Sequence, residues 1–330
     1  MAEVFVTRPI PNRGIEILKA EGFDVVINEI ARERAATKEE MLAALGQARN
    51  EGKPFSALLS VLTEEIDAEI MDAAGPQLKI IANYAVGFDN IDLAAAKQRR
   101  IMVTNTPEVL TNTVAEHTFA LMLAIAHRVS EADRFSRAGL YKAWGPELLL
   151  GTDVSGKTLG VIGLGRIGSR VAHHAVKGFG MKVMYTDPKP NPDFEREYGA
   201  IYAASVDELL PQGDFVSIHA PLLDSTRHLI NEARLKMMRP TAYLINTSRG
   251  PIIDEKALAA ALVQGWIKGA AIDVFENEPE ITPELKTLDN IILTPHIASA
   301  TAETRNKMAV LAAENIIEAL EGKIPPNLVK

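Results

Sequence analysis

Cysteine does not occur in this chain of 330 residues. Its absence excludes a disulfide framework, a thiol nucleophile and a cysteine-based metal site, and it fits the reducing cytoplasm, which is the predicted location. Long apolar runs are also missing, because no stretch approaches the roughly 20 residues that a membrane-spanning helix needs. The amino-terminal segment MAEVFVTRPI lacks the basic region and long apolar stretch of a signal peptide, so none is expected.

Basic residues are in the minority. The 35 Lys and Arg against 43 Asp and Glu give a formal net charge of -8. This charge disfavours nucleic acid or an anionic membrane as a partner, because both attract basic surfaces. The seven histidines include no HExxH pair, so no metal site is expected. A small molecule is therefore the predicted partner.

Short runs rich in β-branched residues alternate with amphipathic stretches along most of the chain. This alternation predicts an α/β protein with two domains, each a parallel sheet flanked by helices, and 330 residues suffice for both. The predicted strands are 3–7, 24–28, 56–60, 79–85, 182–187, 215–220, 242–248, 269–275 and 290–295, together with an apolar run that ends just before Gly163. The predicted helices include 14–22, 38–46, 67–75, 92–100, 208–212, 231–238 and 255–265.

Two further helical patterns organise the domains. The last one, roughly 299–321, has no sheet of its own, so we expect it to pack on the first domain. This gives a discontinuous, flavodoxin-like substrate-binding domain of residues 1–104 and 296–330, and a Rossmann-type dinucleotide-binding domain of residues 105–295. The reaction site is expected in the cleft between them. Residues 111–139 form one long helical pattern, apolar nearly all round at its centre, which predicts burial between domains or against another subunit.

Gly163, Gly165 and Gly168 form a GxGxxG pattern inside VIGLGRIGSR. In dinucleotide-binding folds the first glycine permits a tight turn, the second admits the diphosphate, and the third lets the helix pack closely on the strand. The diphosphate lies at the helix N-terminus, where free N–H groups and the helix dipole favour an anion. The preceding strand and the following helix support this reading over a plain glycine-rich turn.

Asp187 ends the next apolar run and can accept hydrogen bonds from the hydroxyls of an adenine ribose. Its charge would repel a 2′-phosphate, so NAD(H) is the preferred cofactor. Lys189 lies nearby in the sequence, which leaves NADP(H) possible.

Arg249, Glu278 and His296 stand at or just beyond the carboxyl ends of predicted strands, where open α/β sheets bind ligands. A nicotinamide enzyme that reduces a keto acid must hold the carboxylate, polarise the carbonyl and deliver a proton. An arginine fork suits the first task, because it can grip both carboxylate oxygens, and a histidine supported by a carboxylate suits the third. Each residue alone could be structural, as a surface ion pair, a solvated loop charge or a hydrogen-bonded ring. His219, at the end of FVSIHA, is a weaker alternative for the proton donor.

The motifs INTSRGPIID, GAAIDVFENEP and LTPHIAS, after a GLGRIG fingerprint, closely resemble those of the D-isomer-specific 2-hydroxyacid dehydrogenase family. The resemblance covers essentially the whole chain and implies a two-domain dimer. It also implies that His296 donates the proton, that Glu278 is its carboxylate partner, and that Arg249 anchors the substrate carboxylate and carbonyl. The cofactor contacts that it implies beyond the glycines are Arg166, Ile167, His219, Ala220, Pro221, Thr247, Arg249 and Asp273, the last beside the nicotinamide carboxamide.

The segment NYAVGFDNID resembles the family's substrate-carboxylate loop, which implies that the N–H groups of Val86 and Gly87 bind the carboxylate; a plain strand-to-helix turn is the alternative. Leu58 would add an apolar wall to the pocket, or serve as a core residue of its strand. YKAWGPELLLGTDVSGKT most resembles the glyoxylate and hydroxypyruvate reductase branch, in which a tryptophan of the partner subunit closes the pocket. Trp144 occupies that place, although a tryptophan before Gly-Pro is often a packing anchor. The 111–139 region would then form the homodimer interface.

Together these features predict an NAD(H)-dependent oxidoreductase that reduces glyoxylate or hydroxypyruvate to the D-hydroxy acid. Two alternatives remain open. One is a reductase of bulkier branched-chain or aryl 2-keto acids, and the other is an NAD-sensing binding protein of the same fold.

Overall fold

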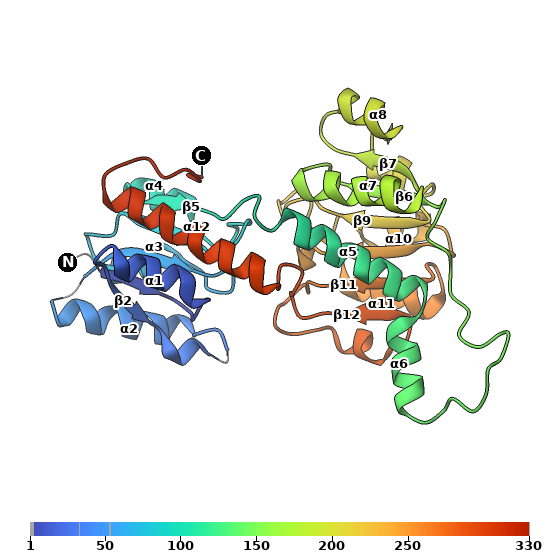
Figure 1. The fold of residues 1–330 in the computed structure, drawn as a ribbon, viewed down its shortest axis with the longest axis horizontal. Helices are drawn as coiled ribbons and strands as arrows, with labels where there is room; N and C mark the ends of the chain where they lie inside the picture. The colour runs from blue at the N-terminus through green and yellow to red at the C-terminus, as the bar shows by residue number, and fades with distance from the viewer. Residues whose placement is uncertain (1–2, 33, 53, 330) are drawn as a thin grey trace. The chain divides into compact units, whose positions relative to one another are not determined.

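The computed structural model describes residues 3–32, 34–52 and 54–329. The chain divides into two compact units, one formed by Met1–Leu110 with Ala300–Lys330 and the other by Thr111–Ser299. Each unit is a parallel sheet flanked by helices, which confirms the predicted fold class (Figure 1). None of the described helices is both long and apolar enough to cross a membrane.

Within the described residues, the first unit has five strands in the order β2-β1-β3-β4-β5, which is the flavodoxin-like order. The strands are β1 (Glu3–Val6), β2 (Asp24–Ile27), β3 (Phe55–Ser60), β4 (Ile80–Asn83) and β5 (Met102–Thr104). The helices are α1 (Asn12–Ala20), η1 (Glu29–Arg32), α2 (Lys38–Asn50), α3 (Ala68–Ala74), α4 (Leu93–Gln98) and α12 (Ala302–Leu320).

Helix α12 packs against α1 and against strands β3, β4 and β5 of this sheet. Figure 1 shows α12 beside α1 although they come from opposite ends of the chain. The two helices touch at Gly14, where a Cβ would lie 2.4 Å from the carbonyl oxygen of Ala309. The Tyr84 hydroxyl also donates a hydrogen bond of 2.6 Å to the Arg305 carbonyl. The last helix is therefore an integral layer of the first unit.

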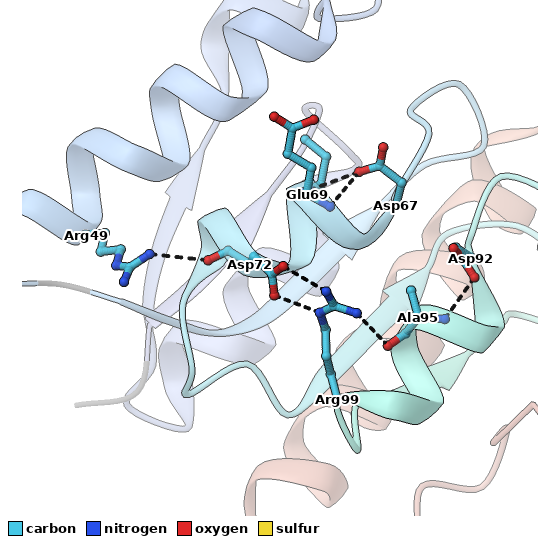
Figure 2. A network of polar contacts seen from close by, with 8 residues as sticks. Arg49, Asp67, Glu69, Asp72, Asp92, Ala95 and Arg99 are labelled. Carbon is cyan, nitrogen blue, oxygen red and sulfur yellow. Dashed lines mark hydrogen bonds and ion pairs between the residues drawn. The ribbon is translucent and has the colours of Figure 1, made fainter.

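A polar network joins three helices of this unit at its surface (Figure 2). Arg99 donates two hydrogen bonds of 2.7 Å to the carboxylate of Asp72, and it also donates one of 3.2 Å to the Ala95 carbonyl. Arg49 reaches the Asp72 carbonyl from α2 at 3.5 Å. The Arg99 hydrogen bonds hold the pKa of Asp72 below its usual value. Because these side chains are exposed, water screens the pair, and the network orients the helices more than it stabilises them.

The second unit contains, within residues 111–299, seven strands in the order β12-β11-β10-β9-β6-β7-β8. The order reverses direction between β6 and β9, as in a Rossmann-type sheet. The strands are β6 (Thr158–Ile162), β7 (Lys182–Thr186), β8 (Ile201–Tyr202), β9 (Phe215–Ile218), β10 (Tyr243–Asn246), β11 (Gly269–Ile272) and β12 (Ile291–Leu293). The helices are α5 (Thr111–Ala126), α6 (Val129–Arg137), α7 (Arg166–Phe179), α8 (Pro192–Tyr198), α9 (Val206–Leu209), α10 (Glu232–Met237), η2 (Gly250–Ile252), α11 (Glu255–Gln264) and η3 (Pro283–Thr287).

Both faces of the second sheet are buried. Along β10, Leu244 belongs to one apolar cluster, while Tyr243 and Ile245 belong to another. Because successive side chains of a strand point to opposite faces, these clusters cover the two sides of the sheet. This burial explains why its strands read as nearly continuous apolar runs.

The prediction of a single helix over residues 111–139 is wrong. The chain forms α5 and α6 instead, with Arg128 in the left-handed region at φ 54 between them. The Ala126 carbonyl accepts the N–H of Thr152 at 2.8 Å rather than continuing a helical ladder. Arg128 is held by two hydrogen bonds to Glu131, of 2.7 and 2.6 Å. A tertiary hydrogen bond therefore ends the first helix where the sequence carries no breaker.

Candidate active site

Three neighbouring strands bring the predicted catalytic residues to one edge of the second sheet. Arg249 follows β10, Glu278 follows β11 and His296 follows β12. These strands pair in parallel, β10 with β11 and β11 with β12, so their carboxyl ends lie side by side. The fold thus gathers residues that are widely separated in the sequence.

His296 and Glu278 form a hydrogen-bonded pair, with 2.9 Å between Nδ1 of the ring and Oε2 of the carboxylate. Their side chains are 24% and 28% exposed, so the pair is shielded but open to a ligand. The other carboxylate oxygen of Glu278 accepts the N–H of Phe275 at 3.0 Å. Since Glu278 occupies Nδ1, Nε2 is the ring nitrogen left to meet a substrate.

Asp273 fixes the backbone that presents His296. Its carbonyl accepts the N–H of His296 at 2.8 Å, and its carboxylate accepts the N–H groups of Ile297 and Ala298 at 2.9 and 2.7 Å. These contacts hold His296 at φ 54, in the left-handed region. A residue other than glycine adopts that conformation only where its surroundings enforce it.

The carboxylate of Asp273 is fully buried. Burial alone would raise its pKa, but hydrogen bonds from His117, Thr294, Ile297 and Ala298 outweigh this effect and lower the pKa. His117 comes from α5, and its Nε2 lies 3.4 Å from the carboxylate. The expectation that Asp273 contacts a nicotinamide carboxamide stays a prediction.

The Arg249 loop is closed by a buried asparagine. The Asn246 side chain donates to the Arg249 carbonyl at 2.9 Å and accepts the N–H and hydroxyl of Ser248 at 3.0 and 2.9 Å. At Gly250 a Cβ would lie 1.9 Å from the carbonyl carbon and oxygen of Phe275. Only glycine permits this approach, which sets the Arg249 loop directly against the loop that carries Glu278.

The glycine loop between β6 and α7 fits a bound diphosphate. Gly163 has φ 93, and a Cβ there would lie 2.8 Å from the N of Ala220. A Cβ at Gly168 would lie 2.0 Å from the Gly163 carbonyl oxygen, so the helix approaches the strand as predicted. A Cβ at Gly165 would meet nothing within 4 Å. The N-terminus of α7, a helix of 14 residues, therefore opens on free space that suits an anion.

The other predicted cofactor residues open helix α7 or follow the carboxyl ends of strands in the same sheet. Asp187 follows β7, and its Oδ2 accepts the N–H of Leu164 at 2.7 Å, which holds the acid beside the glycine turn. Thr247 is buried, with its hydroxyl 2.9 Å from that of Thr118. Arg166 and Ile167 open helix α7, and His219, Ala220 and Pro221 follow directly after β9.

His219 is a poor proton donor. Burial lowers its pKa to about 3, so the ring is neutral near pH 7. Its Nε2 lies 2.8 Å from the Ser217 hydroxyl. The alternative that His219 serves as the acid is therefore disfavoured, while a main-chain role beside Gly163 remains compatible with its position.

The predicted substrate residues of the first unit have different surroundings. Val86 and Gly87 follow β4, and their carbonyls accept the side-chain amides of Asn105 and Asn83 at 2.8 Å each, which fixes the loop. Leu58 is fully buried in the core of the first unit. It is a core residue of β3, so its assignment to a substrate pocket wall is wrong.

Trp144 is 80% exposed, so it is not a packing anchor within its own chain. Sequence reasoning missed the supporting residues Asn246 and His117, because nothing in their spacing indicates which loop each one holds. Across the described residues, no group of three or more histidines or acidic residues is placed to hold a metal ion.

Comparison with known proteins agrees with the family resemblance of the sequence motifs. The family profile described as "D-isomer specific 2-hydroxyacid dehydrogenase, NAD binding domain" matches residues 119–298. The chain is similar to a glyoxylate reductase from Korarchaeum cryptofilum, with 49% identity over 329 residues that cover 99% of this chain and 95% of the relative. A solved glyoxylate reductase from Paecilomyes thermophila aligns with a TM-score of 0.85 and 31% identity, covering 99% of this chain and 98% of that one. An NADPH-dependent glyoxylate/hydroxypyruvate reductase from Sinorhizobium meliloti aligns with a TM-score of 0.82 and 31% identity, covering 100% and 97%.

Proposed function

Because this chain belongs to the D-isomer-specific 2-hydroxyacid dehydrogenase family, we propose that it reduces glyoxylate or hydroxypyruvate to the D-hydroxy acid with NADH. The family makes it an oxidoreductase that acts on CH–OH groups. The observation that carries the substrate chemistry is the His296–Glu278 pair beside the Arg249 loop. The names of the relatives, which are glyoxylate reductases over nearly the full length, support the small keto acid.

The side chains divide the work of reduction. Arg249 binds the substrate carboxylate and polarises the keto oxygen through its N–H groups. When bound, the reduced nicotinamide supplies the hydride that adds to the keto carbon. His296 gives the proton of Nε2 to the oxygen as negative charge develops there. Glu278 stabilises the imidazolium and keeps Nδ1 engaged, so that the proton lies on the nitrogen that faces the substrate.

NAD(H) is the proposed preferred cofactor, and Asp187 is the residue that supports it. Its position beside the glycine turn suits the two hydroxyls of a ribose, and its charge opposes a 2′-phosphate. The similar enzyme from Sinorhizobium meliloti is NADPH-dependent, so the preference needs a direct test. Replacing Asp187 with serine should narrow the ratio of kcat/KM for NADH over NADPH, and an unchanged ratio would contradict the assignment.

We assign the second unit, Thr111–Ser299, to cofactor binding and the first unit, Met1–Leu110 with Ala300–Lys330, to substrate binding; these bounds lie a few residues beyond the expected boundaries of 105–295 and of 1–104 with 296–330. The N–H groups of Val86 and Gly87 are the proposed ligands of the substrate carboxylate, in a loop that side-chain amides already fix. A cytoplasmic location likewise stays a prediction.

A second copy of this chain is the proposed partner of the segment after α6. Leu140, Tyr141, Trp144 and Leu150 are 54%, 56%, 80% and 61% exposed, and α6 itself buries no residue. An apolar surface of this kind supports an interface. We propose a homodimer through the 111–139 region in which Trp144 closes the substrate pocket of the partner. Sedimentation should show that the wild type is a dimer, and steady-state kinetics should show a raised KM for the keto acid in Trp144→Ala. A monomeric wild type would contradict this proposal.

One assay tests the proposed activity. Oxidation of NADH and of NADPH is followed with glyoxylate, hydroxypyruvate, pyruvate, 2-ketoisocaproate and phenylpyruvate. We expect the highest kcat/KM with glyoxylate or hydroxypyruvate and NADH. Faster turnover of 2-ketoisocaproate or phenylpyruvate would favour a reductase of bulkier acids. NADH binding without any turnover would favour an NAD-sensing binding protein.

A further inference from the structure

The loop that carries Glu278 is tied at both ends by one buried carboxylate. Glu255, in the first turn of α11, is 2% exposed. Its Oε1 accepts the N–H of Glu276 at 2.6 Å, just before Glu278. Its Oε2 accepts the hydroxyl of Thr282 at 2.5 Å and the N–H of the same residue at 3.3 Å. One rigid group therefore fixes where this loop begins and where it ends.

Glu255 and Glu276 each accept a backbone hydrogen bond from the other. The carboxylate of Glu276 accepts the N–H of Glu255 at 3.2 Å through Oε2, while its Oε1 lies 2.7 Å from Nε2 of His228. Between the two anchors the chain makes a tight turn, in which the N–H of Glu280 bonds to the carbonyl of Asn277 at 2.9 Å. The loop backbone consequently has little freedom to move relative to α11.

Glu278 has few restraints of its own. Apart from the 2.9 Å contact with His296, its carboxylate is held by the N–H of Phe275 at 3.0 Å, which lies in the same loop. The position of this carboxylate relative to the ring depends on the loop backbone. A hydrogen bond of this length tolerates little displacement, because its strength falls steeply with distance and angle.

We propose that Glu255 and Thr282 are positioning residues that hold the Glu278 carboxylate against His296. They touch neither substrate nor cofactor and act only through the loop. The inference rests on the proposed function, since it concerns the proton-donating pair. Thr282 is the better residue to change, because its hydroxyl makes one defined contact and valine matches its shape.

The test compares Thr282→Val, which removes the hydroxyl, with Thr282→Ser, which keeps it. Thr287→Val is the matched control, because Thr287 is an exposed residue of nearby η3 whose hydroxyl donates to the Glu284 carbonyl at 2.9 Å. We expect Thr282→Val to lower kcat for glyoxylate about tenfold to a hundredfold through misplacement of the pair. The pH profile of reduction should also move to lower pH, because the imidazolium loses its carboxylate. NADH affinity should stay that of wild type, and both other variants should retain wild-type kinetics.

A second readout does not need turnover. The ring of His296 is titrated by NMR in each variant, and we expect a lower midpoint in Thr282→Val than in Thr282→Ser. If wild type reduces no keto acid while this midpoint still falls, the proposed function fails and the positioning role stands. If wild type is active and Thr282→Val matches Thr287→Val in kcat, pH profile and midpoint, the positioning role is overturned. Should Thr282→Val not fold, Glu255→Gln, which keeps only one acceptor oxygen, must give the same shift for the inference to survive.

Discussion

The Nδ1 atom of His296 lies 2.9 Å from the Oε2 atom of Glu278. The two residues follow neighbouring parallel strands, β12 and β11, and each is fixed by its own loop rather than by chain proximity. A carboxylate at this distance stabilises the charged ring and decides which nitrogen faces outward. The pair therefore has the form of a proton donor with its support.

Replacing Glu278 with glutamine keeps a hydrogen-bonding side chain and removes the charge. Reduction needs a protonated donor, so activity falls as pH rises and the donor loses its proton. Without the carboxylate the charged ring is less stabilised, so the fall should occur at lower pH than in wild type. The pH dependence of kcat/KM for glyoxylate measures this. An unchanged profile would remove Glu278 from the role.

Replacing Arg249 with lysine keeps a positive charge and loses the planar fork. We expect KM for the keto acid to rise and kcat to fall, with kcat/KM reduced about tenfold or more, since hydrogen bonds to charged groups are worth roughly 1.5–3 kcal/mol. Arg239→Lys is the control, because Arg239 is an exposed arginine that bonds to Asp214 and to the Pro211 carbonyl. Equal kinetics in the two variants would refute the anchor role.

Two glycines of the cofactor loop should respond differently to alanine. In Gly168→Ala the new Cβ would lie 2.0 Å from the Gly163 carbonyl oxygen, so the variant should lose about 1–3 kcal/mol of folding free energy. In Gly165→Ala the new Cβ meets no protein atom within 4 Å and φ is -70, so stability without cofactor should be preserved. NADH affinity should nevertheless fall, because the Cβ enters the proposed diphosphate space. Thermal unfolding and NADH titration separate the two effects, and wild-type NADH affinity in Gly165→Ala would contradict the assignment.

His219 should make the protein less stable as pH falls. Its folded-state pKa is about 3 against an ordinary value of 6.5, so between these values the unfolded chain binds a proton that the folded chain does not. Stability therefore decreases as pH falls through this window, by up to about 1.4 kcal/mol per pH unit from this residue. His219→Gln should show a shallower decrease in denaturant unfolding. Equal slopes in wild type and variant would mean that the ring is not buried in its neutral form.

Local sequence pattern was sufficient to predict the strands and helices on which the candidate site residues lie. The glycine spacing, the acid at Asp187 and the strand ends before Arg249 and His296 depend on local pattern, and the structure has them where they were expected. Features that depend on tertiary contacts were missed. The break at Arg128 follows from the Thr152 N–H bonding to a distant carbonyl.

Short elements, and buried polar side chains that hold a loop, also could not be predicted from the sequence. Strand β8 has two residues, too few for any period to be visible, and α8 begins at an asparagine cap, Asn191, inside a polar segment. The sequence also could not decide the role of Leu58, because an apolar strand residue gives the same sequence pattern whether it lines a pocket or lies in the core. The role of Glu255 depends on a loop that lies beside it only after folding.

The account depends most directly on His296 as the proton donor. His296→Gln should fold and bind NADH as wild type does, because the ring is partly exposed and the loop is held by Asp273. Single-turnover oxidation of bound NADH by glyoxylate should then slow about a hundredfold to ten-thousandfold, the usual contribution of a positioned acid. A variant that binds NADH normally and turns over at the wild-type rate would contradict the central claim.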